Sequence, residues 1–233
     1  MQPPLFFRQF DYDRTLLPNA WLADQENGVT NMEEARRRTG KTIGFPGWLV
    51  LYSMLLSHFR PDRENIIIET GTNIGCSAIM LAQALIDAGV TGHVHTMEID
   101  DPTADTAAKN FKDAKVDDRI TLYRGDAKET LQTVLPTLPK IRAAFLDGSH
   151  DEPDVLREFE LVEPRLDEGA IVFFDNTYQI ADGDEDQRVN GALRAIKETY
   201  GGNILNLEFV SWFTPGLAIW QRETFTLRGP TRL

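Results

Sequence analysis

Residues 66–77 read IIIETGTNIGCS, and this stretch decides the fold. Three consecutive isoleucines predict a strand that is buried on both faces, as the strands of a parallel sheet are. The strand ends at Glu69, and a turn that contains Gly71 and Gly75 follows it. Glycines let the backbone of such a turn approach a ligand closely. The stretch therefore indicates the first strand and the ligand-binding turn of an open α/β sheet.

A helix should follow this turn. Ser77 is expected to cap a helix over residues 78–88, which Gly89 then stops. The N-terminus of that helix presents free N–H groups toward the turn, where a nucleotide-like ligand would lie. A strand–turn–helix junction that serves packing alone is the alternative, and the stretch by itself does not exclude it.

Two other nucleotide-binding turns fit the sequence poorly. A dinucleotide-binding G-x-G-x-x-G motif would place its second glycine at position 73, where this chain has Asn73. A P-loop would need Gly-Lys-Ser/Thr after the glycine spacing, and this turn lacks it. A nicotinamide oxidoreductase is therefore disfavoured.

The rest of the chain alternates strands with helices. Further strands are predicted over residues 93–100, 119–127, 141–150 with its loop, and 170–177, and a C-terminal hairpin over 206–212 and 216–223. Helices are predicted over residues 48–59, 103–114, 128–135, 152–163 and 189–200. This alternation implies right-handed crossovers and a doubly wound, mostly parallel sheet, to which the hairpin adds antiparallel pairing.

Residues 1–47 differ from the rest and are predicted to form an N-terminal helical cap, with the main domain over residues 48–233. Aromatic residues there are spread among polar ones without a clean period. Thr30 and Glu33 have the spacing of a capping box, which would open a short polar helix through Arg38.

The composition of the chain excludes several classes of function. The 233 residues carry a net charge of −12, which argues against a nucleic acid or an anionic membrane surface as the main partner. The single cysteine, Cys76, excludes an intramolecular disulfide framework and a multi-cysteine zinc site. The sequence shows neither a signal-peptide pattern nor an apolar run of membrane-spanning length, so the cytoplasm is the expected location.

Acidic side chains mark the end of every predicted parallel strand. They are Glu69, Glu98, Asp126, Asp147 and the pair Asp175–Asn176. Ligands bind outside the carboxyl ends of such strands, so these side chains should converge on one site. Like charges repel when they are brought together, and a cation or several hydroxyl groups should therefore lie among them. Glu98 follows the glycine turn by about 20 residues, the place where an acidic residue accepts from ribose hydroxyls.

The E-x-G-x-x-x-G-x-S turn resembles the first motif of the Rossmann-like S-adenosylmethionine (SAM) methyltransferases. The resemblance implies a seven-stranded sheet with SAM as the cofactor. The turn would hold the methionine end of SAM, Glu98 would hold the ribose, and Asp126 would face the adenine edge. The cofactor-binding residues implied are Glu69, Gly71, Thr72, Gly75, Ser77, Glu98, Asp126 and Asp147. The loop over residues 41–47 would close over the substrate side.

A second, narrower resemblance concerns Asp147, Asp175 and Asn176. They are similar to the magnesium ligands of the metal-dependent catechol and caffeoyl-CoA O-methyltransferases, and oxygen ligands of this kind suit Mg²⁺. The catechol enzymes have a lysine three residues after the first aspartate, where this chain has His150. The D-G-x-H motif is also typical of bacterial methyltransferases related to sugar and macrolide O-methylating enzymes, only some of which use a metal.

His150 is predicted to be catalytic together with Asp147. A histidine with the ordinary pKa of about 6.5 is mostly a free base at neutral pH and can accept a proton. The alternative is a loop histidine that hydrogen-bonds the neighbouring Asp151 and Glu152. His93 and His95 lie at the opposite end of their strand from Glu98, so solvated or packed side chains are expected there.

The sequence thus predicts a SAM-dependent O-methyltransferase that acts on a hydroxylated small molecule, with Mg²⁺ held by Asp147, Asp175 and Asn176. One alternative is a metal-independent N- or O-methyltransferase. Another is a SAM-binding regulatory protein without activity. The N-terminal extension could support a homodimer, and the sequence leaves this open.

Overall fold

The computed structural model describes residues 17–27, 32–39, 47–177, 179–181, 184–185, 187–207 and 216–223. Several sequence predictions lie wholly or partly outside these residues. They include the N-terminal cap over residues 1–47 with its capping-box residue Thr30 and the loop before Gly47, and the part of the C-terminal hairpin over residues 208–215.

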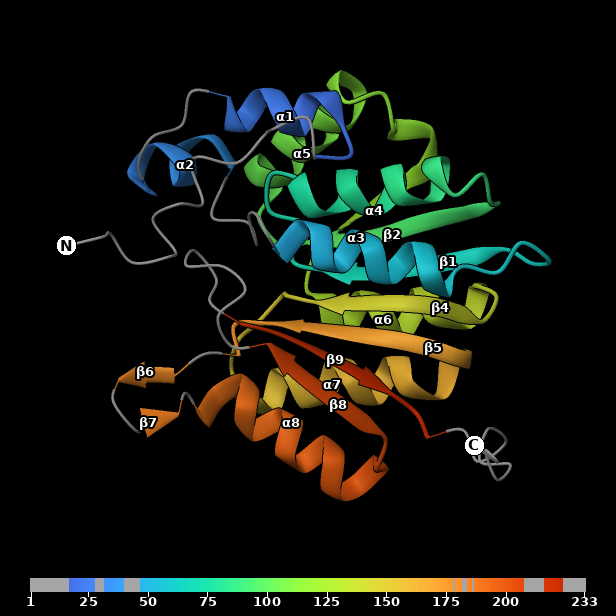
Figure 1. The fold of residues 1–233 in the computed structure, drawn as a ribbon, viewed down its shortest axis with the longest axis vertical. Coiled ribbons are helices and arrows are strands. Elements are labelled where there is room, and N and C mark those ends of the chain that lie inside the picture. Colours follow the sequence, from blue (N-terminus) through green and yellow to red (C-terminus); the bar gives the residue numbers. More distant parts are fainter. Residues whose placement is uncertain are drawn as a thin grey trace, which may run out of the picture.

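Seven strands form one mixed sheet (Figure 1). In chain order they are β1 (Asn65–Thr70), β2 (Gly92–Glu98), β3 (Ile120–Arg124), β4 (Ile141–Leu146), β5 (Leu166–Asp175), β8 (Asn203–Leu207) and β9 (Leu217–Gln221). Their order across the sheet is β3-β2-β1-β4-β5-β9-β8. The first five are parallel, and β9 pairs antiparallel with both β5 and β8. The predicted doubly wound α/β sheet with an antiparallel C-terminal pair is confirmed.

The helices lie on both faces of the sheet. They are α1 (Ala20–Glu26), α2 (Met32–Thr39), α3 (Gly47–His58), α4 (Cys76–Asp87), α5 (Asp101–Asp113), α6 (Ala127–Val134), α7 (Glu152–Val162) and α8 (Gln187–Tyr200). Short 3₁₀ turns occupy Asp117–Arg119, Leu135–Thr137 and Glu163–Arg165, and a small separate sheet pairs β6 (Gln179–Ala181) with β7 (Asp184–Glu185). Among the helices described, none has the length and apolar character that crossing a membrane requires.

Strand β1 shows why the sheet needs both helical layers. All six of its residues are buried. Ile67 packs into the core under α3, α4 and α5, whereas Ile66 and Ile68 pack into the core under α6, α7 and α8. A strand with apolar side chains on both faces is stable only when both faces are covered.

The start of helix α4 corrects one prediction. Ser77 does not cap this helix; the helix begins at Cys76, and Gly75 is its N-cap residue without a side-chain hydrogen bond. Gly75 has φ +91°, and a Cβ there would lie 2.4 Å from Cε1 of Phe111. Because only glycine meets both conditions, the cap falls on Gly75, and Ser77 lies buried in the first turn.

The described part of the N-terminal region packs on α4. Asn19 caps α1 by accepting a hydrogen bond from the Trp21 backbone N–H at 2.9 Å. Its amide nitrogen donates to Gln83 Oε1 at 2.9 Å and to the Ala114 carbonyl at 3.3 Å. The Asn19 side chain thus caps α1 and hydrogen-bonds it to the main sheet domain. The predicted division at residue 47 stays a prediction.

Candidate active site

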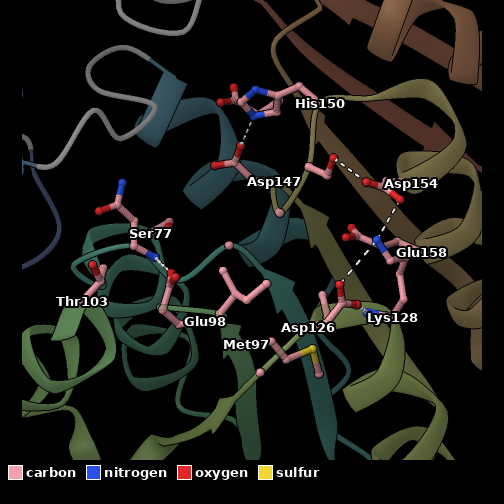
Figure 2. A pocket seen from close by; sticks show the side chains of 18 of the residues that line it. Ser77, Met97, Glu98, Thr103, Asp126, Lys128, Asp147, His150, Asp154 and Glu158 are labelled. Atoms are coloured by element: carbon pink, nitrogen blue, oxygen red, sulfur yellow. Dashed lines mark hydrogen bonds and ion pairs between the residues drawn. The ribbon is translucent and has the colours of Figure 1, made fainter. Parts of the chain in front are cut away.

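One cavity of about 620 Å³ lies at the carboxyl edge of the parallel strands (Figure 2). Its lining comes from the ends of β1 to β5 and from the first turns of the helices that follow them. Eight of the predicted site residues line it: Gly71, Ser77, Glu98, Asp126, Asp147, His150, Asp175 and Asn176. The sheet topology therefore brings together side chains that are far apart in the sequence.

The glycine turn lines this cavity through Gly71 and Asn73. Gly71 has φ +78°, and a Cβ there would lie 2.2 Å from the carbonyl oxygen of Asp147. The backbone N–H groups of Gly71 and Thr72 both donate to the Met97 carbonyl at 3.0 Å. The turn is thus held on β2 and pressed against the loop that carries Asp147.

Glu98 points into the cavity from the end of β2. Its Oε2 accepts from the Asn73 N–H at 2.7 Å, and its Oε1 accepts from the Asp100 N–H at 2.9 Å. Asn73 adopts φ +50°, a left-handed conformation that asparagine tolerates better than most residues. Each carboxylate oxygen keeps acceptor capacity beyond its backbone donor, so a vicinal diol could bind here.

Three predicted cofactor residues lie behind the cavity wall, because Glu69, Thr72 and Gly75 are absent from the described lining. Glu69 is fully buried, and its Oε2 accepts from the Thr96 hydroxyl at 2.5 Å. The Thr96 hydroxyl in turn lies 2.5 Å from that of Thr72. Burial raises the pKa of Glu69 to about 7. These residues support the glycine turn from within the protein. Their contact with a cofactor stays a prediction.

Asp126 lies on the far side of the cavity from Ser77 (Figure 2). It is the N-cap of α6, and its Oδ1 accepts from the Lys128 N–H at 2.8 Å. Its Oδ2 lies 3.5 Å from the Lys128 ammonium group. The helix cap therefore fixes this carboxylate at the cavity edge.

The other half of the cavity holds the residues with predicted metal and catalytic roles. His150 Nε2 lies 3.3 Å from Asp147 Oδ1 and 2.7 Å from Asn176 Nδ2. The same Asn176 nitrogen donates to Asp175 Oδ2 at 3.2 Å. Because the Asn176 amide nitrogen can only donate, Nε2 of His150 accepts this hydrogen bond in the tautomer that carries its proton on Nδ1. The His150 side chain is 40% exposed, so it lies at the mouth of the cavity.

The two aspartates in this half repel each other. Burial raises the pKa of Asp175 well above its ordinary value, and the neighbouring charge of Asp147 raises it further. Burial likewise raises the pKa of Asp147, with the charge of Glu69 adding to the effect. In both cases burial is the main cause, because it disfavours the charged form of a carboxyl group.

The donor set fits a hard divalent cation. Asp175 Oδ1 is buried, and no donor reaches it from the part of the chain that the structure describes. Asp147 and Asp175 supply carboxylate oxygens, and Asn176 supplies an amide oxygen, the ligand types that Mg²⁺ prefers. In the described ranges, no group of three or more His, Cys, Asp or Glu side chains has a metal-holding arrangement. A metal would therefore depend on the Asn176 oxygen and on water or substrate to complete its coordination.

The cavity also contains residues that the sequence did not single out. They include Ile99, Thr103, Lys128, Ser149, Asp154 and Glu158. Glu158 is 2% exposed and accepts from the Thr70 hydroxyl at 2.7 Å. Burial raises its pKa to about 7. Ile99, 71% exposed, could have been suspected because it directly follows Glu98. Lys128, Asp154 and Glu158 gave no comparable signal in the sequence. Whether a helical side chain faces the cavity depends on how α6 and α7 pack.

The chain is similar to known methyltransferases. A family model described as a methyltransferase domain matches residues 68–177, a range that contains every predicted site residue. Among similar structures is the O-methyltransferase TomG from Streptomyces achromogenes, involved in tomaymycin synthesis and solved with SAM. The two share 22% identity over 96% of this chain and 100% of that chain, with a TM-score of 0.73.

Two further structures were solved with S-adenosylhomocysteine (SAH). The O-methyltransferase from Bacillus cereus is 20% identical over 88% of this chain and 91% of that chain, with a TM-score of 0.69. The methyltransferase PaMTH1 from Podospora anserina is 17% identical over 88% of each chain, with a TM-score of 0.68. Residues 68–177 therefore match the methyltransferase-domain model, and the chain has the fold of these solved methyltransferases.

Proposed function

We propose that this protein transfers the methyl group of SAM to a hydroxyl group of a small molecule, with the help of a divalent metal ion. The observation that carries the proposal is that one cavity is lined both by Glu98 and by the group Asp147, Asp175 and Asn176. A diol-binding carboxylate and an oxygen-ligand set at one strand edge match what a metal-assisted O-methyltransferase needs.

The cofactor half would be formed by residues whose positions are already fixed. Glu98 would accept from the ribose hydroxyls, since two backbone N–H groups hold its carboxylate in place. The exposed side chain of Ile99 offers an apolar surface to a purine ring, with Asp126 at the opposite edge. When bound, SAM supplies a methyl group on a positively charged sulfur, and the acidic lining favours that charge.

The acceptor half would orient the hydroxyl group and take up its proton. A divalent cation on Asp147, Asp175 and Asn176 would supply a Lewis acid that lowers the pKa of a nearby hydroxyl group. His150 Nε2 would accept the proton as the O–H bond breaks. Methyl transfer from SAM would form the bond from the acceptor oxygen to carbon, break the bond from carbon to sulfur and leave a neutral thioether. Closely held reactants and excluded water account for much of the rate.

Calorimetry on chelator-treated protein tests the proposal. SAM and SAH should both bind without metal, and Mg²⁺ should bind separately. Asp175→Asn should lower Mg²⁺ affinity at least tenfold while SAH affinity changes less than about threefold. The control is Asp105→Asn, which alters an exposed aspartate on α5 that pairs with Arg124. Absence of SAM and SAH binding by the wild-type protein would overturn the assignment.

A metal-independent methyltransferase is the second candidate. It is favoured by one observation, the absence of a three-member His, Cys, Asp or Glu group from the described residues. In that case the Asp147–Asp175 pair would only shape the pocket. Full methyl transfer by chelator-treated protein, measured with a panel of hydroxylated acceptors, would select this candidate over the metal-assisted one.

A further inference from the structure

Lys128 occupies an electrostatically unfavourable place. It lies in the first turn of α6, two residues after the N-cap Asp126, where the helix dipole disfavours positive charge. It is also the only lysine or arginine among the described residues that line the cavity. A cation at such a position needs a compensating partner from outside its own helix.

That partner is Asp154, in the first turn of α7. The Lys128 ammonium group donates to Asp154 Oδ1 at 2.7 Å and lies 3.5 Å from Asp126 Oδ2 (Figure 2). The hydrogen bond to Asp154 is the main cause of a raised Lys128 pKa, and the one from Lys128 is the main cause of a lowered Asp154 pKa. The ammonium group therefore bridges the carboxylate on the cofactor side to the start of α7.

Asp154 extends this link into the loop that carries the acceptor-side residues. Its Oδ2 accepts from the Ser149 hydroxyl at 2.9 Å, and the Ser149 oxygen accepts from the Asp151 N–H at 3.3 Å. His150 lies between Ser149 and Asp151, so both of its neighbours are held by the same hydroxyl group. A continuous chain of polar contacts thus runs from Asp126 through Lys128, Asp154 and Ser149 to the backbone around His150.

We infer that Lys128 is a positioning residue. It acts through Asp154 and Ser149 to hold the 147–150 loop at a fixed position relative to the cofactor side of the cavity. This inference rests on the proposed function, because it takes Asp126 as the cofactor side. The Lys128 and Asp154 side chains are 30% and 34% exposed, and ion pairs this accessible add little to global stability. The ion pair between Lys128 and Asp154 therefore contributes to the position of the 147–150 loop.

Hydrogen exchange with and without SAH tests this role without knowledge of the acceptor. In the wild-type protein, SAH should slow exchange at the backbone amides of residues 149–151. Lys128→Met should remove at least two thirds of that added protection, while the SAH dissociation constant changes less than about threefold and the melting temperature scarcely moves. Asp154→Asn should reproduce the loss, and Lys128→Arg should restore protection. Lys109→Met, which breaks an exposed ion pair with Asp113 on α5, should keep it.

Three results would overturn the inference. Undiminished protection in Lys128→Met would show that the loop does not depend on this chain. A tenfold loss of SAH affinity would place Lys128 in cofactor binding itself. Equal losses of protection throughout the Lys128→Met protein would indicate a general structural role. Failure of the wild-type protein to bind SAH would instead contradict the proposed function, so the two failures are distinguishable.

Discussion

Gly71 is the position at which the cofactor turn touches the acceptor-side loop. An added Cβ would meet the Asp147 carbonyl oxygen at 2.2 Å, and the φ of +78° already disfavours any side chain. Gly71→Ala should therefore displace the turn and the Asp147 backbone together. We expect at least a tenfold loss of SAH affinity and a clear drop in melting temperature, measured by calorimetry and thermal unfolding.

Gly89→Ala is the matched control for this substitution. Gly89 also has a positive φ, +63°, but a Cβ there would meet nothing within 4 Å. Gly89→Ala should lower the free energy of unfolding only by the left-handed backbone penalty of roughly 1–2 kcal/mol, and it should leave SAH affinity unchanged. If both variants bind SAH like the wild-type protein, the close approach at Gly71 has no part in shaping the site.

At the residue scale, the predictable part of the site was the part that topology dictates. Residues that follow a parallel strand must lie at the same sheet edge, so Glu98, Asp147 and Asp175 could be placed together from sequence order alone. Glu158 and Lys128 could not, because a helical side chain reaches the cavity only through the way its helix packs. Whether the predicted residues bind SAM or a metal stays a prediction.

At the scale of elements, one side chain, Asn19, both caps helix α1 and hydrogen-bonds it to the main sheet domain. Asn19→Ala should lose the N-cap bond to Trp21 and the links to Gln83 and Ala114, with a loss of about 2 kcal/mol in the free energy of unfolding. Asn19→Asp keeps the capping oxygen and loses the amide donor, so its loss should be smaller. Denaturant unfolding of both variants measures this. Equal stability of Asn19→Ala and wild type would mean that the Asn19 hydrogen bonds contribute nothing to the stability of the folded domain.

Element boundaries were less predictable than element types. Sequence reasoning placed the helical cap on Ser77 because serine is a favoured N-cap residue. The structure places it on Gly75, because the chain must turn there with a positive φ beside Phe111. Strand β5 likewise begins at Leu166 and runs through Gly169, whereas the sequence predicts its start at residue 170. In both cases a tertiary contact or a sheet pairing outweighed the local preference.

At the scale of the whole molecule, buried carboxyl groups should make stability fall as the pH rises. Glu158 has a pKa of about 7, above the ordinary 4.5, because burial disfavours its charged form. The folded state therefore binds this proton more tightly than the unfolded state. The resulting stabilisation is complete below about pH 4.5 and is lost as the pH rises through about 7.

Glu158→Gln should remove this contribution, since glutamine stays neutral and can still accept from Thr70. In chelator-treated protein, the variant should gain on the order of 2 kcal/mol relative to wild type between pH 5 and pH 8. Glu160→Gln on the same helix, exposed and paired with Arg157, should follow the wild-type curve. Denaturant unfolding across this pH range measures the difference. Parallel curves for Glu158→Gln and wild type would contradict an ionised, buried Glu158 at pH 8.

The sheet order also has a consequence for how the chain folds as it is synthesised. Strand β1 pairs with β2 on one side, but its other neighbour is β4, which follows only after β2, β3 and three α-helices. Until the ribosome has released β4, one edge of the three-isoleucine strand stays open to pairing with other chains. Nascent chains that stall between residues 70 and 141 should therefore be the aggregation-prone species of this protein and the natural clients of a chaperone.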